Sequence, residues 1–220
     1  MTETKTLKPT NDCYSAGERT AMLRNQEWRG EVLRPLLKLL TRARVSPDHV
    51  TVASLLAGLA FWPGWFYEPA LAFGLLLLHV LLDGLDGPLA RFQNVASRKG
   101  SFTDTMADQL VVFATTLTMI VAGEAHVISA SIYLFAYTIV VAFAMIRNAL
   151  EIPYSWLVRP RFIIYAWLVV NAYWLPGSLD WVLIAFDALL SWKLATGFYK
   201  LRKKLADDEE AAESAIVNQS

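Results

Sequence analysis

Four aspartates in a largely apolar part of the chain have the type and spacing for chemistry. Asp83 and Asp86 are three residues apart and Asp104 and Asp108 are four apart, so each pair lies on one face of a predicted helix. A short connection makes the two helices antiparallel neighbours, which brings the four carboxylates together. Close anions repel unless cations or protons lie between them, and oxygen ligands alone favour Mg²⁺, Mn²⁺ or Ca²⁺. The spacing therefore predicts a divalent-metal site, where two ions can hold a pyrophosphate for in-line attack at phosphorus.

Two residues beside the aspartates fit the same chemistry. Gly87 lets the backbone approach a phosphate closely, and Arg91 lies one helical turn further on, where its guanidinium can pair with a phosphate. The simpler alternative is that the acids are interfacial side chains paired with Arg91, Arg98 and Lys99. The paired helical spacing of four acids favours a binding site over this alternative. A calcium-binding EF-hand loop is excluded, because the acids lack its alternating ligand spacing.

In one long motif the chain resembles the CDP-alcohol phosphotransferase family, also called CDP-alcohol phosphatidyltransferases. The motif reads Asp83-x-x-Asp86-Gly87-x-x-Ala90-Arg91, eight residues, Gly100-x-x-x-Asp104-x-x-x-Asp108. Members are integral membrane enzymes of phospholipid synthesis that use divalent metal. They displace CMP from a CDP-linked alcohol, usually CDP-diacylglycerol, with a second alcohol. The resemblance therefore implies a lipid donor, an alcohol acceptor, Mg²⁺ or Mn²⁺ as cofactor, and a homodimer.

The resemblance also implies a role for each residue of the motif. Asp108 is implied to be a metal ligand that also serves as general base for the attacking hydroxyl. The other implied metal ligands are Asp83, Asp86 and Asp104. The residues implied to contact the CDP-alcohol are Gly87, Arg91, Ser97 and, at the start of the first span, Asp48 and Thr51. For the stretch around Asp48 the alternative is an ordinary helix start.

Basic residues outside the motif bear on the acceptor alcohol. A phosphorylated acceptor, such as glycerol 3-phosphate or inositol phosphate, needs basic side chains close to the metals. The candidates are Lys99, Arg147, Arg159 and Arg161. The alternative is that these residues only follow the positive-inside rule and bind anionic headgroups. Both interpretations stay open at the level of sequence.

The composition indicates whether these residues lie in a soluble protein or in a membrane protein. Hydrophobic residues make up 55% of the 220-residue chain and charged residues 18%, whereas soluble domains average about 25% charged residues. Together with a mean hydropathy of +0.36, these values indicate an integral membrane protein. Twenty basic and 20 acidic residues give no net charge, so no nucleic-acid partner is expected. The single Cys13 excludes a disulfide framework and a thiolate metal cluster.

Apolar stretches predict an all-α integral membrane protein with six transmembrane helices, preceded by an N-terminal amphipathic surface helix. The spans are expected at 50–66, 69–91, 104–123, 127–147, 161–176 and 178–199. The amphipathic helix is expected at 21–45, after a polar tail at 1–20; its alternative is a helix packed on a soluble partner. The catalytic domain then covers 46–201, and the charged segment 202–220 is predicted to be a disordered tail.

The placement of basic residues predicts the orientation of these spans. Six spans put both termini and the loops 92–103 and 148–160 on one side, where nearly all Lys and Arg residues lie. The opposite connections, near 67–68, 124–126 and 177, contain no Lys or Arg. The positive-inside rule therefore predicts that the termini and the acidic cluster are cytoplasmic.

Two other classes of protein compete with the enzyme. A divalent-cation transporter or channel would use the four aspartates as an ion site, but such sites lie near the bilayer midplane on broken helices. Here the acids lie toward one end of their helices, and Gly87 and Arg91 have no evident role in conduction. A non-catalytic membrane scaffold would not need four clustered carboxylates. The sequence therefore favours the enzyme.

Overall fold

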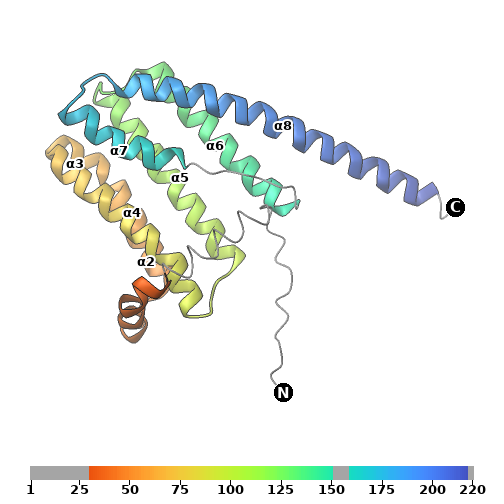
Figure 1. Ribbon diagram of the computed structural model, residues 1–220, viewed down its shortest axis with the longest axis horizontal. Helices are drawn as coiled ribbons and strands as arrows, with labels where there is room; N and C mark the ends of the chain where they lie inside the picture. The colour runs from red at the N-terminus through yellow and green to blue at the C-terminus, as the bar shows by residue number, and fades with distance from the viewer. Residues whose placement is uncertain (1–29, 151–158, 218–220) are drawn as a thin grey trace.

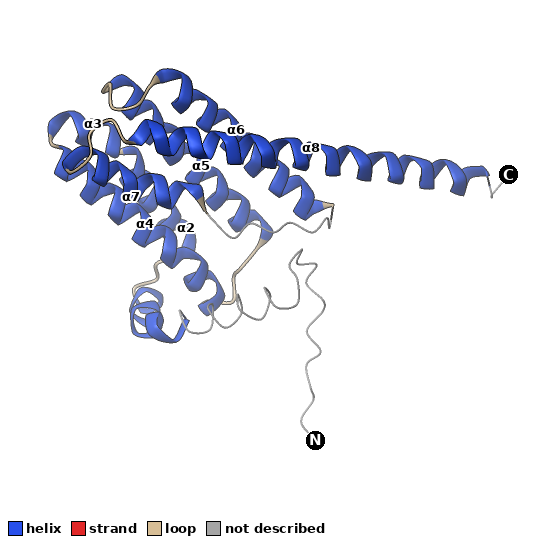
Figure 2. Ribbon diagram, turned by 45° about the horizontal axis from the view of Figure 1, so that its top comes forward, coloured by secondary structure: helices blue, strands red, loops and turns tan. Residues whose placement is uncertain are grey.

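The computed structural model describes residues 30–150 and 159–217, and the regular elements in these ranges are all helices (Figures 1 and 2). A helix at 30–42 comes first. It is followed by α2 (Pro47–Leu59), α3 (Phe61–Tyr67), α4 (Pro69–Phe92), α5 (Arg98–Val121), α6 (Val127–Ala149), α7 (Pro160–Tyr173) and α8 (Leu179–Val217). The predicted tail at 1–20 and the first part of the predicted amphipathic helix lie outside the described residues.

Five segments of the described chain are long and apolar enough to cross a membrane. They are Pro47–Tyr67, Pro69–Phe92, Arg98–Val121, Val127–Arg147 and Leu179–Glu210. The remaining predicted span corresponds to α7, which has 14 residues. At 1.5 Å per residue this helix is about 21 Å long, shorter than the ~30 Å hydrocarbon core. The described residues are thus all-helical as predicted and contain five candidate membrane spans, whereas the count of six spans stays a prediction.

Capping side chains explain where α2 and α5 begin. The Ser46 hydroxyl accepts from the backbone N–H of His49 at 3.3 Å, and the His49 ring accepts in return from the Ser46 N–H, which starts α2 with a capping box. Ser97 starts α5, because its hydroxyl accepts from Gly100 N–H at 3.1 Å. The helix therefore begins six residues before the predicted span at 104, which puts Asp104 well inside the helix.

The helices pack as a bundle in which α2 lies against α4 and α5, and α6 lies against α8 (Figure 1). A close approach of α2 to α5 depends on Gly58, since a Cβ at this position would overlap the Val111 side chain. Phe61, Val111 and Tyr133 are among the buried members of the main core. Helix α2 thus packs on both α4 and α5, and the motif aspartates of these two helices come together at one end of the bundle.

The helix at 30–42 packs on this bundle through one of its faces. Leu37 is buried in a small cluster with Val50 of α2 and Leu89 of α4. Val32 and Leu39 on the same helix are exposed apolar side chains. This pattern fits the predicted amphipathic character, and the location at a membrane surface stays a prediction.

The last helix, α8, differs from expectation because it continues far beyond the rest of the bundle (Figure 1). The segment predicted to be a disordered tail is helical in the structure as far as Val217. Strong helix formers, mainly Ala, Leu, Lys and Glu, make up most of this segment. Lys204 and Asp208 form an ion pair of 2.6 Å one turn apart, which also supports the helix.

Candidate metal centre

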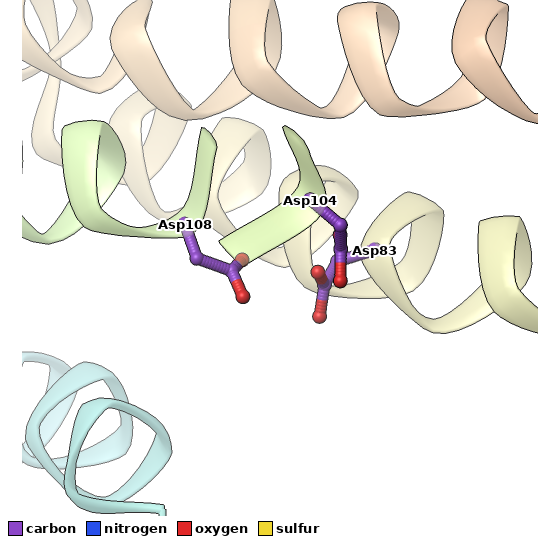
Figure 3. Close-up of side chains that lie close together, drawn as sticks. All are labelled: Asp83, Asp104 and Asp108. Atoms are coloured by element: carbon purple, nitrogen blue, oxygen red, sulfur yellow. The ribbon is translucent and has the colours of Figure 1, made fainter. Parts of the chain in front are cut away.

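Three of the four motif aspartates come together in space (Figure 3). Asp83 comes from α4, and Asp104 and Asp108 come from α5. One carboxylate oxygen from each lies within 4.8 Å of the others, and all three side chains are partly buried. Hard divalent cations prefer such oxygen ligands, so the donor set fits Mg²⁺ or Mn²⁺.

The fourth aspartate, Asp86, lies next to this group and is held by other partners. Its Oδ2 accepts a hydrogen bond of 2.9 Å from the Thr51 hydroxyl of α2. Its Oδ1 accepts a hydrogen bond of 2.5 Å from the backbone N–H of Gly87. Asp86 is therefore tied to α2 and to its own helix, and its part in binding an ion stays a prediction.

An arginine from α7 pairs with two of the clustered acids. Arg161 Nη2 donates to Asp83 Oδ2 at 2.9 Å, and Arg161 Nη1 forms an ion pair with Asp108 Oδ2. The guanidinium lies 4.7 Å from the centre of the Phe162 ring, and Arg161 is only 3% exposed. Its two contacts join α7 to both helices of the motif.

The formal charge of this group is strongly negative. Asp83, Asp86, Asp104 and Asp108 would carry four negative charges if all were ionised, and the Arg161 guanidinium pairs with two of them. Charges taken out of water need partners of opposite sign, and an uncompensated excess is costly. The arrangement can therefore bind divalent cations, and through them a diphosphate.

The residues predicted to contact the CDP-alcohol fall into two groups. Gly87 and Arg91 lie together as predicted, because a Cβ on Gly87 would be 3.5 Å from Arg91 Nη1. Ser97 instead caps α5, and the Thr51 hydroxyl bonds to Asp86, so both side chains have partners within the protein. Asp48 is exposed in the first turn of α2. A nucleotide role for these three residues stays a prediction.

The four basic candidates for acceptor binding also divide in two. Arg147 and Arg161 are buried, at 5% and 3% exposed, which is unusual for arginine. Arg147 is in the last turn of α6 and Arg161 is in the first turn of α7. Lys99 and Arg159 are exposed. Only the first two therefore have the burial expected of a built anion site.

Two features of the bundle were not found by sequence reasoning. The pairing of Thr51 with Asp86 joins residues 35 positions apart, for which no sequence spacing gives a signal. Asp187 in α8 had a signal, namely an acid in an apolar helix. Its Oδ1 is buried without a hydrogen-bond partner among the described residues.

His79 lies one turn before Asp83 and is only 1% exposed. Its Nδ1 is 2.9 Å from the Ser54 hydroxyl of α2. This contact ties α4 to α2 directly beneath the acids.

The motif, the fold and the acidic cluster agree with a known family. The family model for CDP-alcohol phosphatidyltransferase matches residues 44–194, which is more than half of the chain. The chain belongs to this family. The family is named for the transfer of a phosphatidyl group from a CDP-alcohol, and these comparisons give no support to the transporter alternative.

Relatives within the family differ in the acceptor that their names state. Archaetidylinositol phosphate synthase of Aeropyrum pernix is 33% identical over 51% of this chain and 53% of its own length. Phosphatidylinositol phosphate synthase of Cutibacterium acnes is 36% identical over 36% of this chain and 39% of its own length. CDP-diacylglycerol–serine O-phosphatidyltransferase of Mycobacterium leprae is 31% identical over 41% of this chain and 33% of its own length. The chain thus spans about half or less of the length of these relatives.

A solved structure shares the fold of this family member. The crystal structure of phosphatidylinositol phosphate synthase from Mycobacterium tuberculosis, in complex with manganese and citrate, has a TM-score of 0.63 and 20% sequence identity. The match covers 75% of this chain and 86% of that one. At this identity the likeness shows a common fold.

Proposed function

We propose that this protein transfers a phosphatidyl group from a CDP-alcohol, CDP-diacylglycerol in the first instance, to an acceptor alcohol and releases CMP. The observation that carries the proposal is the convergence of the Asp83, Asp104 and Asp108 carboxylates from two consecutive helices of a membrane bundle. These acids occupy the fixed positions of the family motif. The proposal includes two divalent ions, Mg²⁺ or Mn²⁺, held by the four motif aspartates.

The residues around the cluster have separable tasks in this reaction. Bound divalent ions would neutralise the diphosphate and stabilise the charge that develops at phosphorus. Gly87 leaves room beside the Arg91 guanidinium, which would pair with a phosphate of the CDP moiety. Asp108 would accept the proton of the acceptor hydroxyl at a carboxylate oxygen, because an alcohol needs a positioned base at the moment of attack.

The acceptor is proposed to carry a phosphate of its own. Arg147 and Arg161 are buried at the end of the bundle where the acids lie, and a guanidinium group can bind two phosphate oxygens at once. Glycerol 3-phosphate and inositol phosphate are the first candidates. Two relatives are named for inositol phosphate products and one for serine, so the acceptor must be tested directly.

The position of the site relative to the membrane is part of the same proposal. The site would lie at the cytoplasmic face, with both termini on that side, where a water-soluble nucleotide and acyl chains can meet. The homodimer implied by the family resemblance stays a prediction, which size-exclusion chromatography with light scattering would test.

A release assay tests the proposed function. Purified protein in lipid nanodiscs would receive CDP-diacylglycerol, Mg²⁺ or Mn²⁺, and one of four acceptors: glycerol 3-phosphate, inositol phosphate, serine or inositol. We expect CMP release with a phosphorylated acceptor. Release with serine alone would contradict the assignment of Arg147 and Arg161 and leave the transfer reaction standing. No CMP with any acceptor, CDP-alcohol donor or metal would contradict the transfer reaction itself.

A further inference from the structure

The pairing of Arg161 has a consequence for metal binding. Its guanidinium contacts one carboxylate from α4, Asp83, and one from α5, Asp108. These are two of the three acids whose oxygens lie within 4.8 Å of one another. The positive charge that balances part of the cluster is therefore a side chain of α7.

A divalent ion and this guanidinium would share the same carboxylates. Asp83 Oδ2 accepts from Arg161 Nη2 at 2.9 Å, and Asp108 Oδ2 pairs with Nη1. Metal–oxygen bonds of Mg²⁺ are about 2.0–2.1 Å long, so an ion bound by these two acids lies close to the guanidinium. Two like charges within a few ångströms repel, so each cation weakens the binding of the other.

The surroundings of the Arg161 side chain allow it to leave these two carboxylates. Its third nitrogen, Nε, is buried and has no hydrogen-bond partner among the described residues, so the head group is held only through Nη1 and Nη2. The Phe162 ring, 4.7 Å from the guanidinium, offers a surface on which the charge can shift. Arg161 lies in the first turn of α7, close to that helix's end.

We infer that Arg161 is the internal counter-ion of the metal-free site, and that divalent ions displace it from Asp83 and Asp108. The displaced guanidinium then becomes available to an oxyanion of the acceptor. Metal binding thereby creates the acceptor's anion site, and by linkage an acceptor oxyanion favours the metal-bound state. This inference deepens the proposed function and rests on it for the identity of the acceptor.

Metal affinity without any substrate tests the inference. Isothermal titration with Mn²⁺ would compare the wild-type protein with Arg161→Met and the matched control Arg159→Met, which removes an exposed arginine two residues away. Removal of the competing cation should make Mn²⁺ binding about tenfold tighter in Arg161→Met. Arg159→Met should stay within twofold of wild type. Unchanged or weaker binding in Arg161→Met would overturn the inference.

Thermal unfolding adds a second readout of the same exchange. Without metal, Arg161→Met should unfold several degrees below wild type, because it leaves two partly buried carboxylates unpaired. Saturating Mn²⁺ should remove most of this difference. An equal loss of Tm with and without Mn²⁺ would mean a purely structural role for Arg161 and would overturn the inference.

A spectroscopic test avoids the risk that Arg161→Met does not fold. In wild-type protein with ¹⁵N-labelled arginine, the Arg161 Nη signals can be assigned by their loss in Arg161→Lys. Addition of Mg²⁺ should shift or merge them as the carboxylate contacts break, and unchanged signals at saturating Mg²⁺ would contradict displacement. CMP release with unchanged Nη signals would refute the inference and keep the proposed function. Displacement of Arg161 without CMP release under any condition would support the inference and contradict the proposed function.

Discussion

The acidic residues at the two ends of the bundle have different kinds of partners. At the acidic end, where α4 ends and α5 begins, carboxylates crowd together and share one arginine. At the opposite end, Glu124 accepts from the Asn171 amide at 3.0 Å, and Asp180 accepts from the backbone N–H of His126 at 2.7 Å and from Ser129 at 3.2 Å. Each of these acids has neutral donors of its own.

The difference separates acids that bind ligands from acids that join helices. A carboxylate with its own neutral donors is satisfied as the protein stands, and it fixes a helix start or a loop. Carboxylates that outnumber their donors and counter-charges are satisfied only when something else binds. The carboxylate group is the same at both ends, so the number of partners for each charge distinguishes the two roles.

The largest effect of a single substitution should come from Asp108→Asn. The amide has nearly the same shape but cannot take a proton from the acceptor hydroxyl, so CMP release should fall about 10²- to 10⁴-fold. Mn²⁺ titration and thermal unfolding would show whether the site and the fold persist. The matched control is Asp180→Asn at the opposite end, which should release CMP within twofold of wild type. Full-rate release by Asp108→Asn would remove this residue from the role of base.

Removal of metal should affect the acidic end of the bundle and leave the opposite end intact. EDTA should abolish CMP release, and an excess of Mg²⁺ or Mn²⁺ should restore it, because the excess negative charge of the acidic end needs cations. Circular dichroism should show that the helices remain. If release continued in EDTA after dialysis, the four motif aspartates would not act through metal.

A smaller effect is expected at Thr51, whose hydroxyl donates to Asp86. Thr51→Val keeps the shape and removes the donor, and loss of such a supporting hydrogen bond commonly costs 10- to 100-fold in metal affinity or activity. Thr51→Ser keeps the hydroxyl and should remain within about threefold of wild type. The comparison is made by Mn²⁺ titration and CMP release. Equal behaviour of the two variants would mean that Asp86 needs no support from α2.

Much of the acidic end could be predicted because its information is local. Spacings of three and four residues place Asp83 with Asp86 and Asp104 with Asp108, and apolar runs identify the helices that carry them. The partners of these acids could not be predicted, because Arg161 is 78 positions from Asp83 and Thr51 is 35 positions from Asp86. Such contacts depend on how separate helices pack.

The ends of the helices also show what could and could not be predicted from local sequence. The start of α5 at Arg98 follows from the Ser97 cap, a signal that hydropathy alone misses. The extension of α8 to Val217 follows from helix propensity in a polar segment, where hydropathy suggested disorder. By contrast, the predicted span at 161–176 runs three residues past the observed end of α7 at Tyr173.

The smallest effect on turnover should come from the opposite end. Asn171 donates to Glu124 and accepts from the backbone N–H of Leu179 at 3.0 Å, so it joins the end of α7 to two other segments. Asn171→Leu removes both bonds and leaves a buried N–H unpaired, which should cost about 1–3 kcal/mol of stability. Thermal unfolding should therefore shift downward, while Mn²⁺ affinity and CMP release at a temperature well below Tm should stay within twofold of wild type. A large loss of metal affinity in this variant would show that the two ends are coupled, and satisfied acids could then no longer be treated as independent of the cluster.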